Sequence, residues 1–108
     1  MAKTLEGDFV HIVFFWLKNP DSEDDRAAFL KEIRAYTSHI DVIKNLHIGS
    51  PADTSRPVID SSYTYCLVTS FDSKADHDAY QAHPLHKQFI ANAEHLWEKV
   101  LVYDSEMV

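Results

Sequence analysis

Apolar residues along this chain are gathered into short runs that are separated by polar, turn-forming stretches. Four runs, rich in β-branched and aromatic side chains, occupy residues 9–17, 43–49, 63–71 and 97–104. Runs of this length and composition, bounded by residues such as Asn, Pro, Asp and Gly, are typical of strands rather than helices. The pattern therefore predicts four strands.

A different spacing follows the first run. Phe29, Ile33, Tyr36 and Ile40 recur every three or four residues, which is the spacing of one face of a helix. Ser22 precedes three acidic residues and is a favourable N-cap, because its hydroxyl can accept a backbone N–H and the acidic residues suit the positive helix end. We expect a helix from about residue 23 to about residue 38.

The second helical segment is interrupted by a proline. Ser73 and Asp76 have the spacing of a capping box at the start of a helix. Pro84 is unfavourable inside a helix but acceptable in a first turn, so we expect one helix to end at His83 and a second to cover residues 84–96. Residues 50–62 contain two prolines and several serines, and are expected to form a long loop.

The predicted order is strand, helix, strand, strand, broken helix, strand. This order is typical of a ferredoxin-like α+β fold, with a four-stranded antiparallel sheet and its helices on one face. A chain of 108 residues makes a single domain, whose core we expect at about residues 9–104.

Both faces of the predicted sheet are apolar. In the first strand, alternate side chains form two sets, Val10, Ile12, Phe14 and Trp16 on one face and Phe9, His11, Val13, Phe15 and Leu17 on the other. The helices can cover only one face, and an exposed apolar sheet usually marks an interface. We expect a homodimer that packs sheet against sheet as a dimeric α+β barrel, with room for a small apolar ligand.

Composition limits the classes of partner. The formal net charge is −7, and no cluster of Lys or Arg reverses it locally, so neither nucleic acid nor an anionic membrane surface is expected as a partner. No stretch approaches the roughly 20 apolar residues of a membrane helix. Cys66 is the only cysteine and lies in an apolar run, which is typical of a buried residue in a reducing compartment. We expect a cytoplasmic protein.

Three separated motifs resemble one known family. "HIVFFWLK" at residues 11–18, "YQAHPLH" at residues 80–86 and "WEKVLVYD" at residues 97–104 are similar, in this order, to the stress-responsive dimeric α+β barrel family, which includes a plant polyketide cyclase. The resemblance implies that Tyr80 and His86 are catalytic and that His11 lines a pocket. Tyr65 stands where the cyclase has a histidine, and the loop 50–62 looks longer here. The remaining expected ligand-binding residues are Tyr65, His83 and Trp97.

The chemistry implied by the resemblance needs no cofactor. An aldol-type cyclisation requires a base to remove a proton beside a carbonyl, which suits histidine, and a donor to stabilise the oxyanion, which suits a tyrosine hydroxyl. His83 and His86 alone do not make a metal site, and no metal is expected. Structural alternatives are that His83 caps a helix and that His11 is a hydrogen-bonded core residue. Four further histidines are expected in solvent: His39, His47, His77 and His95.

Two classes of function remain open at this stage. The first is a small dimeric enzyme or binding protein for an apolar, carbonyl-bearing molecule. The second is a non-catalytic, stress-associated structural or interaction protein. A cavity lined by both Tyr80 and His86 favours the first class, whereas a barrel filled by side chains favours the second.

Overall fold

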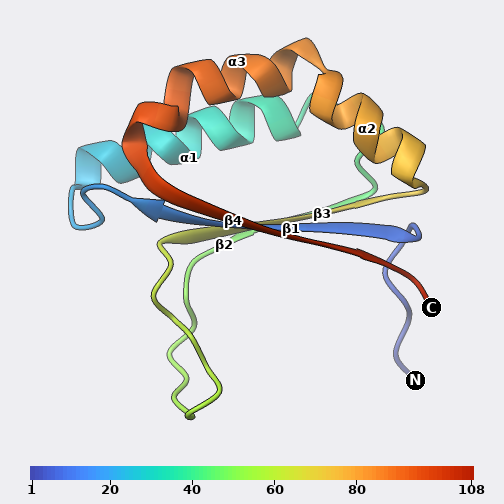
Figure 1. Cartoon of the computed structure of the whole chain (residues 1–108), viewed down its shortest axis with the longest axis horizontal. Coiled ribbons are helices and arrows are strands. Elements are labelled where there is room, and N and C mark those ends of the chain that lie inside the picture. The colour runs from blue at the N-terminus through green and yellow to red at the C-terminus, as the bar shows by residue number, and fades with distance from the viewer.

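The computed structural model describes all residues, 1–108, and contains four strands and three α-helices (Figure 1). In chain order they are β1 (Phe9–Leu17), α1 (Glu23–Thr37), β2 (Asn45–Gly49), β3 (Tyr65–Phe71), α2 (Lys74–Ala82), α3 (Pro84–Ala93) and β4 (Trp97–Glu106). The predicted order of elements and the α+β class are confirmed.

The strands form one antiparallel sheet with the order β2-β3-β1-β4. β1 is central, and His11 faces Thr69 of β3 on one side and Asp104 of β4 on the other. All three helices cover the same face of the sheet, while the loop between β2 and β3 and the N-terminal segment extend from the opposite face (Figure 1). The fold is therefore two layers with one sheet face free of helices.

Local signals explain where the helices begin. The Ser22 hydroxyl accepts the backbone N–H of Asp25, and the Ser73 hydroxyl accepts that of Asp76, as the N-cap pattern predicts. His83 has an extended backbone because the following Pro84 disfavours helical geometry, and this residue separates α2 from α3. The last helix was predicted too long: α3 ends at Ala93, and a short 3₁₀ turn at Glu94–Leu96 leads into β4.

An aromatic core joins the sheet to the helices. Phe29 of α1 is fully buried and lies with its ring centroid 4.9 Å from Phe15 of β1 and 5.3 Å from Tyr65 of β3. Phe89 of α3 and Trp97 of β4 complete this cluster. The residues of β1 alternate as predicted. Phe9, His11, Val13, Phe15 and Leu17 are buried on the face that the helices cover.

The opposite sheet face remains partly uncovered. Val10, Ile12, Phe14 and Trp16 are only half-buried, and Tyr103 of β4 is 58 % exposed. Phe14 and Tyr103 lie on this face with their ring centroids 6.4 Å apart. We call this surface, made of Ile12, Phe14, Trp16, Leu101 and Tyr103, the outer sheet face. No helix in the structure is both long enough and apolar enough to span a membrane.

Candidate functional site

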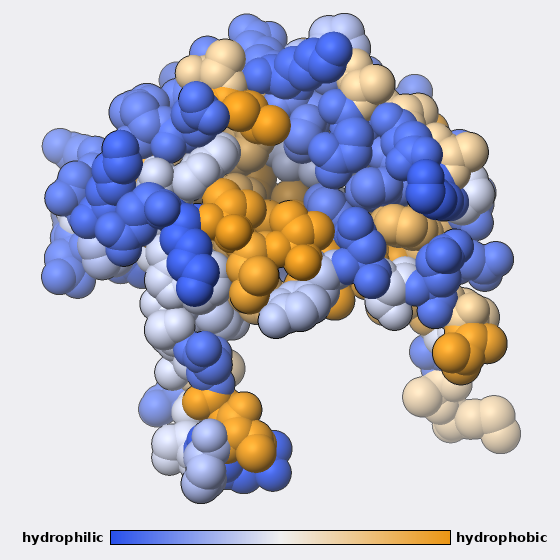
Figure 2. Space-filling view, in the orientation of Figure 1, coloured by the Kyte–Doolittle hydropathy of each residue, from blue (hydrophilic) through white to orange (hydrophobic).

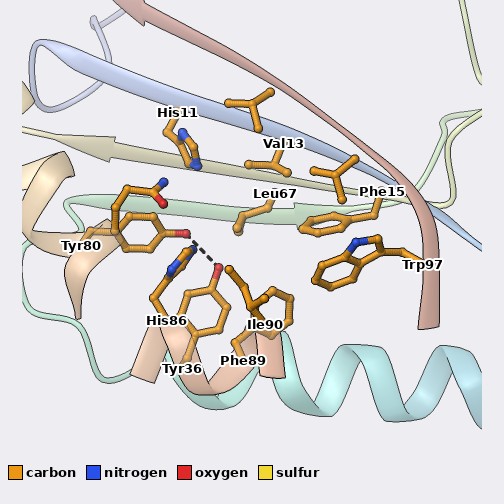
Figure 3. A pocket seen from close by; sticks show the side chains of 13 residues that line it. His11, Val13, Phe15, Tyr36, Leu67, Tyr80, His86, Phe89, Ile90 and Trp97 are labelled. Carbon is orange, nitrogen blue, oxygen red and sulfur yellow. Dashed lines mark hydrogen bonds between the residues drawn. The ribbon is translucent and has the colours of Figure 1, made fainter. Parts of the chain in front are cut away.

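A cavity of about 160 Å³ lies between the sheet and the helices (Figure 3). Its apolar wall comes from both the sheet and the helices, and includes Val13, Phe15, Leu67, Phe89 and Trp97. Its polar members are His11, Tyr36, Tyr80, Gln81 and His86. A mostly apolar cavity with a few converging polar groups is the usual form of a small-molecule site.

The cavity opens beside β4, the edge strand. Val100, Val102 and Ile90 line it and are 39 %, 44 % and 37 % exposed. In Figure 2, apolar side chains gather on the side of the molecule where β4 runs in front of the sheet. These residues form an apolar mouth through which a small apolar molecule can enter.

His11 is held by a carboxylate. Its Nδ1 lies 2.6 Å from Oδ1 of Asp104, its direct cross-strand neighbour, and the side chain of His11 is 4 % exposed. Because the carboxylate accepts a hydrogen bond from Nδ1, the Nε2 atom of a neutral imidazole carries the free lone pair. Burial lowers the pKa of His11 below its ordinary value, although the pairing with Asp104 acts in the opposite direction. The pair has the arrangement of an oriented general base.

Tyr80 and Tyr36 form a buried pair of hydroxyls. Their oxygen atoms are 2.9 Å apart, and Tyr80 is 1 % exposed (Figure 3). Burial raises the pKa of Tyr80 to about 12, and burial together with Tyr80 raises the pKa of Tyr36 well above its usual value. Both hydroxyls therefore stay protonated at neutral pH. One donates to the other, which leaves the second O–H free to donate to a bound molecule.

His86 lies beside this pair. Its ring centroid is 4.8 Å from Tyr80 and 5.6 Å from Tyr36, and its Nδ1 is buried without a hydrogen-bond partner. Burial lowers the pKa of His86, and the neighbouring His11 acts in the same direction. Tyr80 and His86 therefore line one cavity from either side of Pro84, which is the arrangement that the sequence suggested.

Two of the expected ligand-binding residues lie outside the cavity. Tyr65 packs on Phe29 at the other end of the core, and its hydroxyl accepts a hydrogen bond from Nε of Arg26 at 3.1 Å. His83 serves the backbone, because its Nδ1 accepts the N–H of Leu85 at the start of α3. The capping alternative describes His83. His11 and Trp97 line the cavity, and His11 is also the buried, hydrogen-bonded residue of its structural alternative.

The prediction for His77 was wrong. This residue was expected in solvent but is 8 % exposed, with its ring stacked on Phe9 at 4.4 Å and 4.7 Å from the ring of His11. The reason is its position on α2, three residues before Tyr80, on the face that packs against the sheet. That spacing in the sequence was the available signal.

Asp104 and Tyr36 were also missed as members of the site. Asp104 belongs to the "WEKVLVYD" motif, but its role depends on the register of β4 against β1. Tyr36 was assigned only to the buried helix face, and nothing in α1 alone shows that its hydroxyl reaches Tyr80.

The burial of His86 predicts a pH effect on stability. The unfolded chain takes up a proton at this residue near pH 6.5, whereas the folded chain resists it because the pKa is lowered by burial. The stabilising contribution of neutral His86 is therefore complete above about pH 6.5 and decreases as the pH falls towards 5. When the pH is lowered from 7 to 5, the unfolding free energy of His86→Gln should therefore decrease less than that of the natural chain.

This effect can be measured by urea unfolding in EDTA at several pH values. His95→Gln is the control, because it removes an exposed histidine outside the cavity. If the unfolding free energies of the natural chain and of His86→Gln changed equally with pH, the effect assigned to the burial of His86 would be contradicted.

The fold and the cavity define a ferredoxin-like α+β domain with a small apolar site between sheet and helices. The chain belongs to the stress responsive A/B barrel domain family, whose sequence profile matches residues 9–107. It is 26 % identical over 96 residues to a stress-response A/B barrel domain-containing protein of Arabidopsis thaliana, an alignment covering 89 % of this chain and 83 % of that protein.

Two solved structures show the same fold. A dimeric ferredoxin-like protein of unknown function from Thermobifida fusca has a TM-score of 0.76 at 18 % identity, with 98 % of this chain and 97 % of that chain covered. A hydroxynitrile lyase from Passiflora edulis has a TM-score of 0.75 at 20 % identity, with 94 % of each chain covered.

Proposed function

We propose that this protein is a cofactor-free acid–base enzyme that removes a proton beside the carbonyl of a small, apolar molecule. The observation that carries the proposal is the cavity itself, in which an Asp-oriented histidine faces an apolar space together with a pair of tyrosine hydroxyls. An apolar cavity of about 150 Å³ is known to hold benzene, so a volume of about 160 Å³ suits a single ring.

Each polar residue has a role in this reaction. His11 is the base: the C–H bond breaks, the proton passes to Nε2, and the electron pair moves to the carbonyl oxygen. Asp104 positions His11 through the 2.6 Å contact with Nδ1. Tyr80 donates a hydrogen bond to the enolate oxygen, with Tyr36 supporting its hydroxyl. His86 offers a second polar group beside Tyr80 that hydrogen-bonds a polar substituent of the ligand.

Two further points support an enzyme of this class. The Passiflora protein with the same fold is a hydroxynitrile lyase, so this fold can hold catalytic machinery. The resemblance of the "YQAHPLH" motif to a polyketide cyclase implies carbonyl chemistry at Tyr80 and His86. The alternative of a filled, purely structural barrel fits less well, because it predicts side chains where the cavity lies.

The test uses phenylacetone, a single-ring ketone, as the probe. In D₂O, the enzyme should exchange the protons beside the carbonyl for deuterium faster than buffer does, as followed by ¹H NMR. Saturation-transfer NMR on the same samples reports binding separately from exchange. Absence of both binding and exchange, for phenylacetone and for homologous aryl ketones, would overturn the proposal.

A variant at the mouth makes this test specific to the cavity. Ile90→Trp places a large ring at the opening without changing a polar residue, and should reduce both binding and exchange. Leu46→Trp is the matched control, because Leu46 is 45 % exposed on β2 and does not line this cavity. Equal activity of the two variants would place the reaction elsewhere on the molecule.

We also propose that two copies pack through the outer sheet face. Its aromatic and aliphatic side chains are half-buried or exposed in one chain, and each large apolar side chain gains roughly 1.5–3 kcal/mol when it is fully buried. The Thermobifida protein of the same fold is described as dimeric. Such a dimer leaves the helices, and the cavity beneath them, on the outside of the paired sheets.

A single charge on the outer sheet face should separate the two copies. Tyr103 is 58 % exposed, so Tyr103→Lys costs little within one chain but places a buried ammonium in the interface. Sedimentation should show a dimer for the natural chain and a monomer for Tyr103→Lys at micromolar concentration. Ala79→Lys, on the exposed side of α2, should remain dimeric. A monomeric natural chain at these concentrations would exclude the dimer.

A further inference from the structure

We propose that His11, His77 and Asp104 form a binding site for a zinc ion at the edge of the cavity. One donor atom from each of these residues lies within 4.8 Å of the other two. The three residues come from β1, α2 and β4, so their meeting is a property of the fold and not of a sequence motif. The site shares His11 and Asp104 with the proposed reaction and is tested separately from it.

The geometry needs only a modest rearrangement around an ion. Zinc lies about 2.0–2.2 Å from nitrogen and oxygen ligands, so two ligands of one tetrahedral ion are roughly 3.4 Å apart. Nδ1 of His11 and Oδ1 of Asp104 are 2.6 Å apart, so this pair has to open slightly to admit an ion. The side chain of Asp104 is 41 % exposed, which provides a path from solvent to the site.

His77 supplies the second observation. Its side chain is 10 % exposed, yet its Nδ1 makes no hydrogen bond of good geometry, although Oδ1 of Asp78 lies 3.4 Å away. A buried polar atom without a partner costs about 1–3 kcal/mol, and a bound metal ion together with its coordinated water would give this ring polar partners. The ring is held in position by Phe9 and by the Gln81 amide, which lies 3.3 Å from Nε2. Such outer contacts are typical of histidines that bind metals.

The donor set indicates the kind of ion. Two imidazoles and one carboxylate suit zinc or a similar late transition metal, whereas magnesium and calcium prefer oxygen ligands alone. Three protein ligands leave a fourth position for water. Asp78 lies 3.4 Å from Nδ1 of His77 and adds negative charge beside the site. The net charge of −7 further favours the approach of a dication.

The experiment uses full-length protein that has been stripped with EDTA and dialysed. Cobalt(II) is added as a spectroscopic probe, and its visible absorption should saturate at one ion per chain with the intensity of a four- or five-coordinate site. Zinc affinity is then measured by competition with a chromophoric chelator. His77→Gln and Asp104→Asn should each weaken zinc binding at least about tenfold, because even loss of an outer-shell contact commonly costs about 10- to 100-fold.

His95→Gln is the matched control, since it removes an exposed histidine and should leave the affinity unchanged. Circular dichroism of each metal-free variant checks that it is folded, and Asp104→Asn lies on an exposed edge where folding is least affected. The proposal is overturned if less than one ion binds per chain, if both site variants bind zinc as the natural chain does, or if magnesium binds as tightly as zinc. The exchange assay stays a separate test of the proposed function when it is run with EDTA, which removes free metal.

Discussion

Replacing His11 with glutamine should slow the exchange of phenylacetone protons by about 100- to 10,000-fold, which is the usual contribution of a general base. Glutamine keeps a polar side chain of similar reach but has no basic nitrogen. The Tyr80–Tyr36 hydroxyl pair is unchanged in this variant, and so is the apolar wall of the cavity. The measurement is the initial rate of deuterium incorporation at saturating ketone, with binding followed separately by saturation transfer.

Two comparisons separate catalysis from a general disturbance of the site. Asp104→Asn retains the His11 ring but weakens the contact that orients it, so the exchange rate should fall about tenfold or more, because hydrogen bonds to charged groups contribute about 1.5–3 kcal/mol. Tyr80→Phe removes the hydroxyl of the donor pair and should also slow exchange while binding of the apolar ring persists. His95→Gln should behave as the natural chain.

The outcome that would contradict the assignment is specific. If His11→Gln keeps full exchange while His86→Gln abolishes it, then His86 is the base and His11 serves only the structure. If neither variant changes the rate, the cavity does not hold the reacting groups.

Replacing Phe29 with alanine should have the largest effect on stability, a loss of about 3–5 kcal/mol of unfolding free energy. Phe29 is fully buried and lies against rings from four other elements: Phe15 of β1, Tyr65 of β3, Phe89 of α3 and Trp97 of β4. Alanine leaves a cavity that these rings cannot fill without moving. Because small domains are stable by only about 5–15 kcal/mol, this single change removes a large share of the total.

Urea unfolding at fixed protein concentration measures this loss. Lys31→Ala, on the exposed side of α1, is the control and should change stability by less than about 0.5 kcal/mol. Phe29→Leu should give an intermediate loss and remains measurable if the alanine variant does not fold. A loss below about 1 kcal/mol for Phe29→Ala would mean that the aromatic cluster is not the centre of the core.

Structural features that depend on residues close together in the sequence were predicted correctly. The Ser22 and Ser73 caps, the break at Pro84 and the alternation of β1 all depend on neighbours close in sequence, and the structure shows each of them. Errors at this level are small, such as the end of α3 at Ala93 before a short 3₁₀ turn.

Part of the site depends on long-range pairing and was not predicted. Asp104 meets His11 only because β4 pairs with β1 in one register, and a shift by one residue would turn its carboxylate to the other face. Tyr36 and Tyr80 are far apart in sequence, and their hydroxyls meet only when α1 and α2 lie on the same sheet face. Tyr65 was expected in the pocket because of the family resemblance, but its position on β3 places it at the other end of the core.

The amino-acid order was sufficient to determine the strands, the helices, the caps and the two apolar faces of the sheet, because these follow from local backbone preferences and the periodicity of side chains. Only the folded molecule decided that the Tyr36 hydroxyl meets Tyr80, that His77 is buried, and that His11 is held by Asp104. The reason is that such contacts join residues of different elements, and their geometry is set by strand register and helix packing rather than by any single segment.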